Sequence, residues 1–478
     1  MGGLAGLASR CILPGFEGPV APDWVRRRLA EGLGGVVLYA WNVESPEQLR
    51  GLTAELRSER EDVIVAIDEE GGDVTRLEAP TGSSYPGNAA LGIVDDVELS
   101  ERIAASLGAE LAAVGVNLDL APVADVNTNP QNPVIGIRSF GSDADLVGRH
   151  VGAFVRGLQN AGVAACAKHF PGHGDTSVDS HLALPVVDTL DPEALAPFRA
   201  AIEAGVRSIM TAHIVVRSVG DVPATMSSVI LQDVLRGELG FDGVVVTDAL
   251  EMRAISDTVG VEEGAVRSIA AGADALCLGH DLFDESVVAV RDALVGAVRS
   301  GRVSEHRLAE AAGRVTALND IGGVASVDRE SGREAAGRAL RVDGDARIDG
   351  PALIVELVPE AGMAAGRLPD YPGDWFAAAV PGSEVQRYEE APADFPAPDG
   401  RRIVVIARDA HRYRWEQSAI EALTARQPDV IVVEIGLPHW RPPHAATYVA
   451  TYGAARVNLE AAAEALYSEV ATRGGAVR

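Results

Sequence analysis

The sequence has 478 residues, of which 47% are hydrophobic, and this is enough for a large domain followed by a smaller one. The formal net charge of −28 argues against nucleic acid or an anionic membrane surface as a partner, because phosphate binding needs clustered Lys and Arg. No apolar run could span a bilayer, and no basic segment followed by an apolar core indicates a signal peptide. We therefore expect a cytoplasmic protein.

Short apolar segments alternate with helical segments over the first two thirds of the chain. The predicted strands are Arg10–Leu13, Gly35–Tyr39, Val63–Ile67, Val116–Leu120, Val163–Ala167, Ser208–Thr211, Val244–Thr247 and Ala275–Leu278. The predicted helices include Leu99–Val114, Ala144–Ala161, Pro192–Ala204, Ser228–Leu239 and Val261–Ala271. This alternation indicates parallel βαβ units and therefore an α/β fold. The number of predicted strands and the length of chain that they occupy predict a TIM-type (β/α)8 barrel over residues 1–322.

A second, smaller α/β pattern follows the barrel. After a closing helix at Ser304–Asn319, residues 323–350 are rich in Gly, Asp and Arg and are expected to form a linker. Residues 351–478 are expected to form a C-terminal α/β domain, in which Arg367–Gly400 looks like an irregular insert. Its predicted strands and helices are Ala352–Leu357, Arg402–Ala407, Val430–Ile435, Gln417–Ala425 and Asn458–Tyr467.

Polar residues follow five of the predicted barrel strands at the points where the strands end. They are Asp68, Asp125 with Asn127, Lys168 with His169, His213 and Asp248. In a barrel, side chains at the carboxyl ends of the strands line the active site. Five strand ends with polar residues therefore indicate a site at one mouth of the barrel.

The segment Lys168–His181 holds three of the ten histidines and the only lysine in the chain. Arg and Lys differ in shape and donor geometry, so a single Lys among many Arg suggests a position that needs a compact ammonium group. Within this loop Asp179 and His181 stand two residues apart. A carboxylate beside an imidazole raises the pKa of the imidazole and fixes its orientation, so that it can donate and later accept a proton. A histidine that only stabilises the turn remains an alternative.

A metal site is the second alternative for this loop. The side chains of the right type are His169, His173, Asp175, Asp179 and His181. The ammonium of Lys168 would lie beside the cation, which is unfavourable, so we expect no metal and no cofactor. Asp248, which ends another apolar strand, could attack an anomeric carbon or simply cap the following helix.

These motifs together resemble the β-N-acetylhexosaminidases of glycoside hydrolase family 3. The segment Lys-His-Phe-Pro-Gly-His-Gly at Lys168–Gly174, followed after four residues by Asp179-Ser180-His181, matches every fixed position of that signature. Asp68–Gly72 with Arg76, and the block Ile137–Gly141, resemble two further motifs. The chain departs from the family pattern at two positions. Glu69 stands where the family usually has Gln, and Trp41 stands where it often has Arg.

The resemblance implies a retaining glycosidase that acts on a small carbohydrate substrate carrying terminal β-linked N-acetylglucosamine. Asp248 would be the nucleophile, and His181 the acid/base supported by Asp179. The implied sugar-binding residues are Asp68, Arg76, Arg138, Lys168 and His169. Peptidoglycan recycling in the cytoplasm would fit such an activity.

Three other functions remain open from the sequence. A phosphorylase of the same family would use phosphate in place of water, and a neutral histidine would repel phosphate less than a glutamate does. A β-glucosidase is disfavoured by the Asp-Ser-His signature, and a catalytically silent sugar-binding protein by the intact Asp248.

Elsewhere, His213 is a candidate for a role in the pocket, whereas His150 is expected to face solvent from its helix.

Overall fold

The computed structural model describes residues 3–179, 182–280, 283–318, 322–359, 372–392, 395 and 399–467. The chain divides into two compact units. The first comprises Met1–Glu70, Asp96–Ile135 and Ser139–Asp328, and the second comprises Gly71–Asp95, Gly136–Arg138 and Arg329–Arg478. Each unit is built on a parallel sheet with helices, which confirms the predicted α/β fold class of a barrel and a smaller α/β domain.

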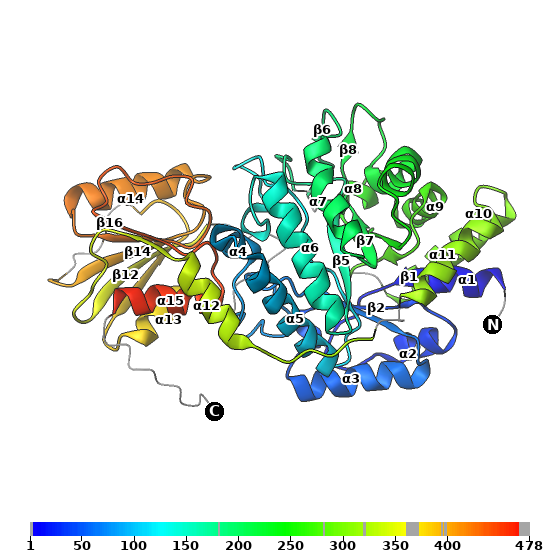
Figure 1. Ribbon diagram of the computed structural model, residues 1–478, viewed down its shortest axis with the longest axis horizontal. Coiled ribbons are helices and arrows are strands. Elements are labelled where there is room, and N and C mark those ends of the chain that lie inside the picture. The colour runs from blue at the N-terminus through cyan, green and yellow to red at the C-terminus, as the bar shows by residue number, and fades with distance from the viewer. Residues whose placement is uncertain are drawn as a thin grey trace. The chain divides into compact units, whose positions relative to one another are not determined.

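Eight parallel strands form a ring in the first unit, as Figure 1 shows in part, and two further strands, β6 (Val186–Val187) and β8 (Val215–Val216), pair separately. The strands of the ring are β1 (Ile12–Leu13), β2 (Gly35–Leu38), β3 (Ile64–Ile67), β4 (Leu118–Asp119), β5 (Ala164–Phe170), β7 (Ser208–Thr211), β9 (Val244–Thr247) and β10 (Leu276–Cys277). Strands β2, β3, β4, β5, β7 and β9 form one continuous sheet, and β1 pairs with β10. A bridge between Val246 and Ala275 joins β9 to β10, and the Val37 N–H donates to the Pro14 carbonyl beside β1, so the ring closes.

One apolar cluster receives side chains from all eight of these strands, so it must lie inside the ring. Its buried strand members are Leu13, Val37, Ile64, Ala66, Leu118, Ala164, Cys166, Met210, Val244, Val246 and Cys277. The inside of the barrel is therefore filled by apolar side chains, and the polar side chains of the predicted site lie where the strands end.

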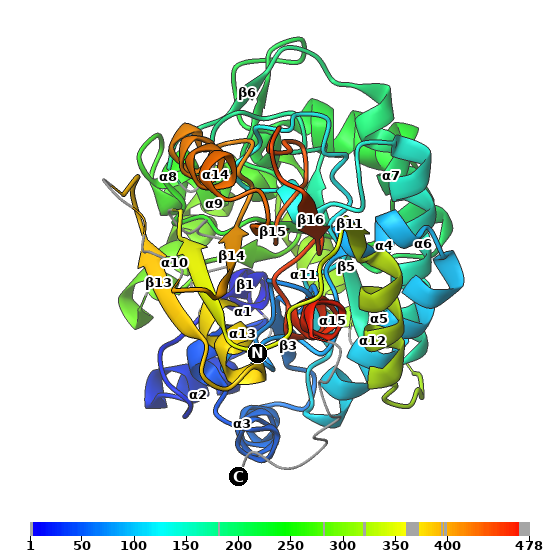
Figure 2. The ribbon, with the colours of Figure 1, turned by 90° about the vertical axis from the view of Figure 1, so that its left-hand side faces the viewer.

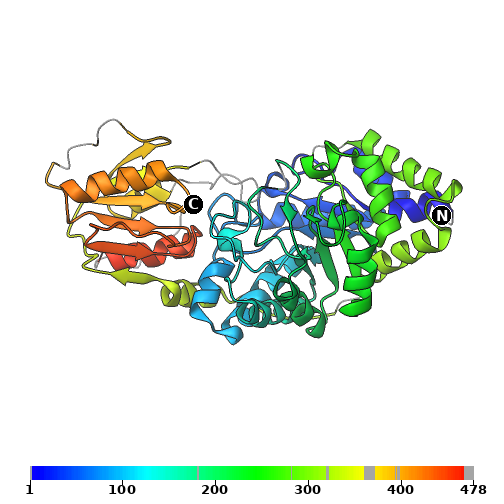
Figure 3. The same ribbon diagram turned by 90° about the horizontal axis from the view of Figure 1, so that it is seen from above.

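Helices surround this ring, and several begin at caps visible in the sequence. The Asp96, Asp143, Asp191 and Ser304 side chains each accept a backbone N–H at the start of a helix. The helices of the first unit are α1 (Leu4–Arg10), α2 (Asp23–Ala30), α3 (Pro46–Glu59), α5 (Val97–Ala113), α6 (Ala144–Asn160), α7 (Pro192–Glu203), η4 (Val229–Glu238), α8 (Arg253–Ser256), α9 (Val261–Ala271), α10 (Asp284–Arg299) and α11 (Glu305–Ala317). Figure 3 shows α1 beside α10 and α11, which it contacts.

The second unit contains a six-stranded sheet in the order β11-β16-β15-β14-β12-β13. The strands are β11 (Arg341–Asp343), β12 (Ala352–Leu357), β13 (Glu384–Tyr388), β14 (Arg402–Ala407), β15 (Ile431–Glu434) and β16 (Thr447–Ala450), and only β11 is antiparallel to its neighbour. Alternate residues of β12 and β14 pack on opposite faces, against α14 (Arg414–Arg426) on one side and against α13 (Pro372–Ala379) and α15 (Arg456–Leu466) on the other. Figure 2 shows this layering of the sheet.

A segment that follows β3 in the sequence belongs to the second unit. This segment, Gly71–Asp95, includes α4 (Asn88–Val94), which contacts α12 (Arg329–Ala339). Ion pairs join Asp73 to Arg408, with 2.5 Å between the charged groups, and Glu78 to Arg456, at 3.3 Å. The second unit is thus assembled from the C-terminal part of the chain and from a loop inserted in the barrel sequence.

Three expectations from the sequence differ from the structure. Residues 323–350 are not only a linker, since they contain α12 and β11, and 367–400 is not wholly irregular, since it contains α13 and β13. His150 is fully buried, not exposed to solvent, because its ring stacks on Phe140 and its Nδ1 lies 2.8 Å from the Ser100 hydroxyl. In the part of the chain that the structure describes, no helix is both long and apolar enough to cross a membrane.

Candidate active site

Lys168, near the end of β5, joins two carboxylates that follow β3. Its Nζ lies 2.7 Å from Oδ1 of Asp68 and 2.8 Å from Oε1 of Glu70, and its side chain is only 3% exposed. An ammonium group has three donors and no fixed plane, so it can serve two carboxylates from different directions in a narrow space. The structure therefore brings together the predicted residues Asp68 and Lys168 and adds Glu70, which was not predicted as a site residue.

An irregularity in β5 explains how two consecutive residues both serve the site. Side chains normally alternate between the faces of a strand, but the pairing of β5 with β7 shifts register between Ala167 and Phe170. Lys168 contacts the β3 carboxylates, while the neighbouring His169 directs its Nδ1 to Oδ2 of Asp125, at 2.7 Å. The irregularity thus allows adjacent side chains to make different polar contacts at the same strand end.

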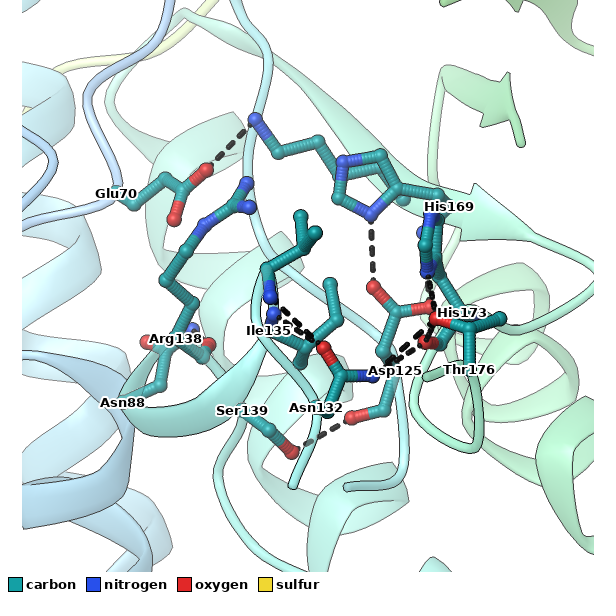
Figure 4. Close-up of polar contacts among 12 residues, drawn as sticks. Glu70, Asn88, Asp125, Asn132, Ile135, Arg138, Ser139, His169, His173 and Thr176 are labelled. Carbon is teal, nitrogen blue, oxygen red and sulfur yellow. Dashed lines mark hydrogen bonds and ion pairs between the residues drawn. The ribbon is translucent and has the colours of Figure 1, made fainter. Parts of the chain in front are cut away.

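Asp125 also fixes the loop that leaves β5. Its Oδ1 accepts the backbone N–H groups of His173, at 2.6 Å, and of His169, at 3.3 Å. The Thr176 hydroxyl donates to the His173 carbonyl at 2.9 Å, so the 2.6 Å contact between Thr176 Oγ1 and His173 Nδ1 is donated by the imidazole. Asn132 donates to the same carbonyl at 2.8 Å, as Figure 4 shows.

Burial lowers the pKa of His173 to about 4, although the nearby charge of Asp125 opposes this change. His173 is therefore neutral at physiological pH and holds the loop through hydrogen bonds. Asp125 was noticed in the sequence only as a polar residue after a strand. Its role depends on contacts with residues more than 40 positions away, which the sequence pattern does not reveal.

Asp248 directly follows β9, at the position predicted for the nucleophile. It is half-buried, and its Oδ1 accepts the Ala249 N–H at 2.8 Å. His213, which follows β7, is fully buried, and its Nε2–H donates to the Ala249 carbonyl at 3.0 Å while its Nδ1 lies 2.8 Å from the Thr225 hydroxyl. His213 thus supports the loop that carries Asp248.

Asp119 at the end of β4 is a further buried carboxyl that the sequence did not identify. It accepts the Glu69 N–H at 2.9 Å. Burial raises its pKa well above the usual range, and the charges of Glu69 and Asp68 add to this effect. An acidic residue inside the apolar run Val116–Leu120 was the signal that could have identified it. Asp119 therefore fixes the backbone beside Asp68.

The two arginines predicted to bind sugar belong to the second unit. Arg76 lies in the segment Gly71–Asp95, and Arg138 closes the short helix η2 (Gly136–Arg138). The Arg138 carbonyl accepts a hydrogen bond from Asn88 at 2.7 Å. The structure thus assigns Arg76 and Arg138 to a different unit from Asp68, Lys168 and His169.

The predicted acid/base, His181, lies outside the described residues, and so does Ser180. Asp179 is described and is buried, and its carbonyl accepts the N–H groups of Leu182 and Ala183, each at 3.0 Å. Asp179 follows in the sequence the loop held by Asp125. Among the residues given positions, no group of three or more His, Cys, Asp or Glu side chains is arranged to hold a metal ion.

Comparison with known proteins gives this arrangement a family context. The sequence profile of the glycosyl hydrolase family 3 N terminal domain matches residues 21–318. A β-hexosaminidase from Neisseria gonorrhoeae (strain NCCP11945) is 37% identical over 293 residues, which cover 56% of this chain and 80% of that protein. A solved family 3 β-N-acetylglucosaminidase from Paenibacillus sp. is 36% identical with a TM-score of 0.85, covering 98% of this chain and 97% of that one.

The coverage differs between relatives. The β-hexosaminidase A of Pseudoalteromonas piscicida is 35% identical over 320 residues, which cover 60% of this chain but only 53% of that protein. The chain therefore spans about half the length of this relative, whereas it spans nearly all of the solved Paenibacillus chain.

Proposed function

The chain belongs to glycosyl hydrolase family 3, and we propose that it is a glycosidase that releases terminal β-linked N-acetylglucosamine with retention of configuration. The observation that carries this proposal is that Asp248 and the Asp68–Lys168 pair stand at the carboxyl ends of strands of one barrel. The names of the relatives, β-hexosaminidase and β-N-acetylglucosaminidase, support the choice of sugar.

In the proposed first step, a carboxylate oxygen of Asp248 attacks the anomeric carbon and the bond to the leaving oxygen breaks. His181 gives its proton to that oxygen, and the sugar remains as an ester of Asp248. In the second step, His181 takes a proton from water, which attacks the anomeric carbon and releases the carboxylate. Two inversions return the β configuration. Asp179 would orient the imidazole and stabilise its charged form.

The innermost sugar would be bound by Asp68, Lys168 and His169, the members of the expected sugar-binding set that lie in the first unit. For Arg76 and Arg138, which lie in the second unit, sugar binding stays an expectation from the family resemblance. Hydroxyl groups form their strongest hydrogen bonds with ionised partners, and the Asp68–Lys168 pair offers both an acceptor and a donor. The loop network around Asp125 would hold His169 and the start of the signature loop in position before substrate arrives. Two glycines give this loop more backbone freedom than other residues would, so it needs such contacts to keep the catalytic side chains in place.

The acceptor in the second step distinguishes a hydrolase from a phosphorylase. An imidazole adds no negative charge beside the glycosyl ester, so phosphate could approach in place of water. We propose water as the acceptor, because the Neisseria and Paenibacillus relatives described above carry the names of hydrolytic enzymes. Action in the cytoplasm on cell-wall fragments remains part of the proposal and rests on the sequence alone.

The test is release of the aryl alcohol from aryl β-N-acetylglucosaminide and from aryl β-glucoside, each with and without phosphate. Preference for the N-acetyl sugar, unchanged by phosphate, is the expected result. Acceleration by phosphate with a sugar 1-phosphate product would replace the hydrolase by a phosphorylase. Preference for the glucoside would indicate a β-glucosidase, and no release from either compound would favour a sugar-binding protein without catalysis.

A further inference from the structure

Three aromatic rings cluster at one part of the barrel mouth, outside the polar residues described above. Tyr39 and Trp41 follow β2, and His280 follows β10. The Tyr39 and Trp41 rings are stacked, with centroids 4.9 Å apart and 14° between their planes. The His280 ring lies against both, with centroid distances of 5.3 Å to Tyr39 and 4.7 Å to Trp41. We refer to these three residues as the aromatic platform.

The platform is held in a fixed orientation although it is partly exposed. Trp41 is 41% exposed, yet its indole N–H donates to the Phe16 carbonyl at 3.0 Å. Asn42 fixes the same loop, because its side-chain amide donates to the carbonyls of Phe16, at 3.0 Å, and Gly18, at 2.7 Å. A large aromatic ring that is oriented by hydrogen bonds and still open to solvent offers a rigid apolar surface for a ligand.

The platform shares the barrel mouth with the proposed catalytic residues. Strand β2 pairs with β3, where Leu38 lies opposite Ile67, and these residues directly precede Tyr39 and Asp68. On the other side β10 is bridged to β9, which ends just before Asp248. Tyr39 and Ala249 pack against the same apolar cluster inside the ring. The aromatic platform therefore occupies the arc between the strand of Asp68 and the strand of Asp248.

The chemistry of the two arcs is different. The arc of β3 and β5 carries carboxylates, an ammonium and an imidazole, which suit the hydroxyl groups of one enclosed sugar. Trp41, which is stacked on Tyr39 and is 41% exposed, offers an aromatic surface that suits the C–H face of a pyranose. A β-linked pyranose presents such a face because its hydroxyl groups lie around its edge. When the leaving group is itself a sugar, its ring is joined to the enclosed sugar through the scissile oxygen and must therefore lie next to it.

We infer that Trp41, supported by Tyr39 and His280, binds the pyranose ring on the leaving-group side of the scissile bond, so that the preferred substrates are β-linked oligosaccharides. The inference rests on the proposed glycosidase function and adds the class of leaving group. Trp41 determines specificity in this scheme and takes no part in proton transfer or in the attack on the anomeric carbon.

The test compares two substrates that differ only on the leaving-group side. The β-1,4-linked disaccharide of N-acetylglucosamine places a pyranose on the platform, whereas methyl β-N-acetylglucosaminide places a methyl group there. Trp41→Ala is expected to lower kcat/KM about tenfold for the disaccharide and less than twofold for the methyl glycoside. Trp41→Phe, which retains a ring, is expected to recover most of the loss. Trp24→Ala, on helix α2, is the matched control for removal of a half-buried Trp.

Each other outcome has a definite meaning. An unchanged ratio of the two kcat/KM values in Trp41→Ala would overturn the inference while leaving the proposed function intact. Equal losses on both substrates, repeated in Trp41→Phe, would overturn it as well, because the ring would then serve the enclosed sugar or the fold. Failure of the unaltered chain to hydrolyse either substrate would overturn the proposed function, and this inference with it.

Discussion

The two units both gather carboxyl groups at the carboxyl ends of parallel strands, but they provide different partners for them. In the barrel, Asp68 and Glu70 contact the ammonium of Lys168. In the second unit, Glu434 at the end of β15 accepts the backbone N–H groups of Asp409 and Gly436, each at 2.7 Å, and of Ala410 at 3.2 Å.

The carboxyl groups of the second unit show what burial does to their charge. In the second unit burial raises the pKa of Glu434 to about 8, with the Asp409 charge adding to the effect, and burial raises the pKa of Glu416 on α14 to about 9. A position at a strand end is therefore not sufficient to indicate chemistry. The partner of the carboxyl group separates residues that can serve a ligand from residues that hold loops.

The largest effect is expected at the barrel mouth from Asp248→Asn. An amide cannot attack the anomeric carbon, so kcat on aryl β-N-acetylglucosaminide should fall by a factor of about 10³ or more. Thermal unfolding should show a melting temperature close to that of the unaltered chain. A loss of less than tenfold would show that Asp248 is not the nucleophile.

Lys168→Arg should have the next largest effect. The side chain is almost fully enclosed, and a planar guanidinium cannot occupy the place of a compact ammonium between Asp68 and Glu70 without displacing them. Displacement of sugar-binding groups should lower kcat/KM about 100-fold. Arg299→Lys, an exposed exchange at the end of α10, is the control for changing the cation type. Near-normal activity of Lys168→Arg would refute the need for an ammonium.

Glu434→Gln tests the structural role assigned to the second unit. The substituted amide would place one NH₂ group toward backbone N–H donors, and an unsatisfied buried donor costs about 1–3 kcal/mol. We therefore expect a lower free energy of unfolding at pH 4, measured with urea, where the side chains of Glu434 and of its replacement are both uncharged, and an unchanged kcat at pH 7. Unaltered stability would contradict the assignment of Glu434 as an anchor of the loop at Asp409.

Glu416→Gln should have an effect of opposite sign that depends on pH. The pKa of Glu416 is higher in the folded state, so the folded state retains a proton that the unfolded chain loses above its ordinary pKa. Its contribution to stability is full below about pH 4.5 and is lost as the pH rises toward 9. Glutamine mimics the protonated group, so the variant should gain stability at pH 8–9 and none at pH 4. A gain independent of pH would contradict this explanation.

The sequence predicted the barrel strands well because the physical signal there is local. Buried parallel strands are near-continuous apolar runs, and Ser208–Thr211 and Val244–Thr247 agree with the structure residue for residue. The edge strand β13 carries the polar sequence Glu-Val-Gln-Arg-Tyr, and helix α12 is rich in Gly and Arg, so neither gave such a signal. Their structure depends on tertiary packing.

The same distinction holds for the site. Asp68, Lys168 and Asp248 could be placed at strand ends from the sequence, whereas the contacts of Glu70 and Asp125 join residues that are distant in the chain. The error at His150 was avoidable. It lies three residues after Val147 and four before Phe154, which are both buried, so helical periodicity places it on the inner face.

The enclosure of Lys168 has a practical consequence for handling the protein. The sequence contains no other lysine, and this ammonium is buried, so the folded barrel exposes no lysine side chain of this sequence to amine-directed reagents. Reaction of Lys168 with an activated ester would therefore report that the barrel had opened, which gives a chemical measure of unfolding without any substitution.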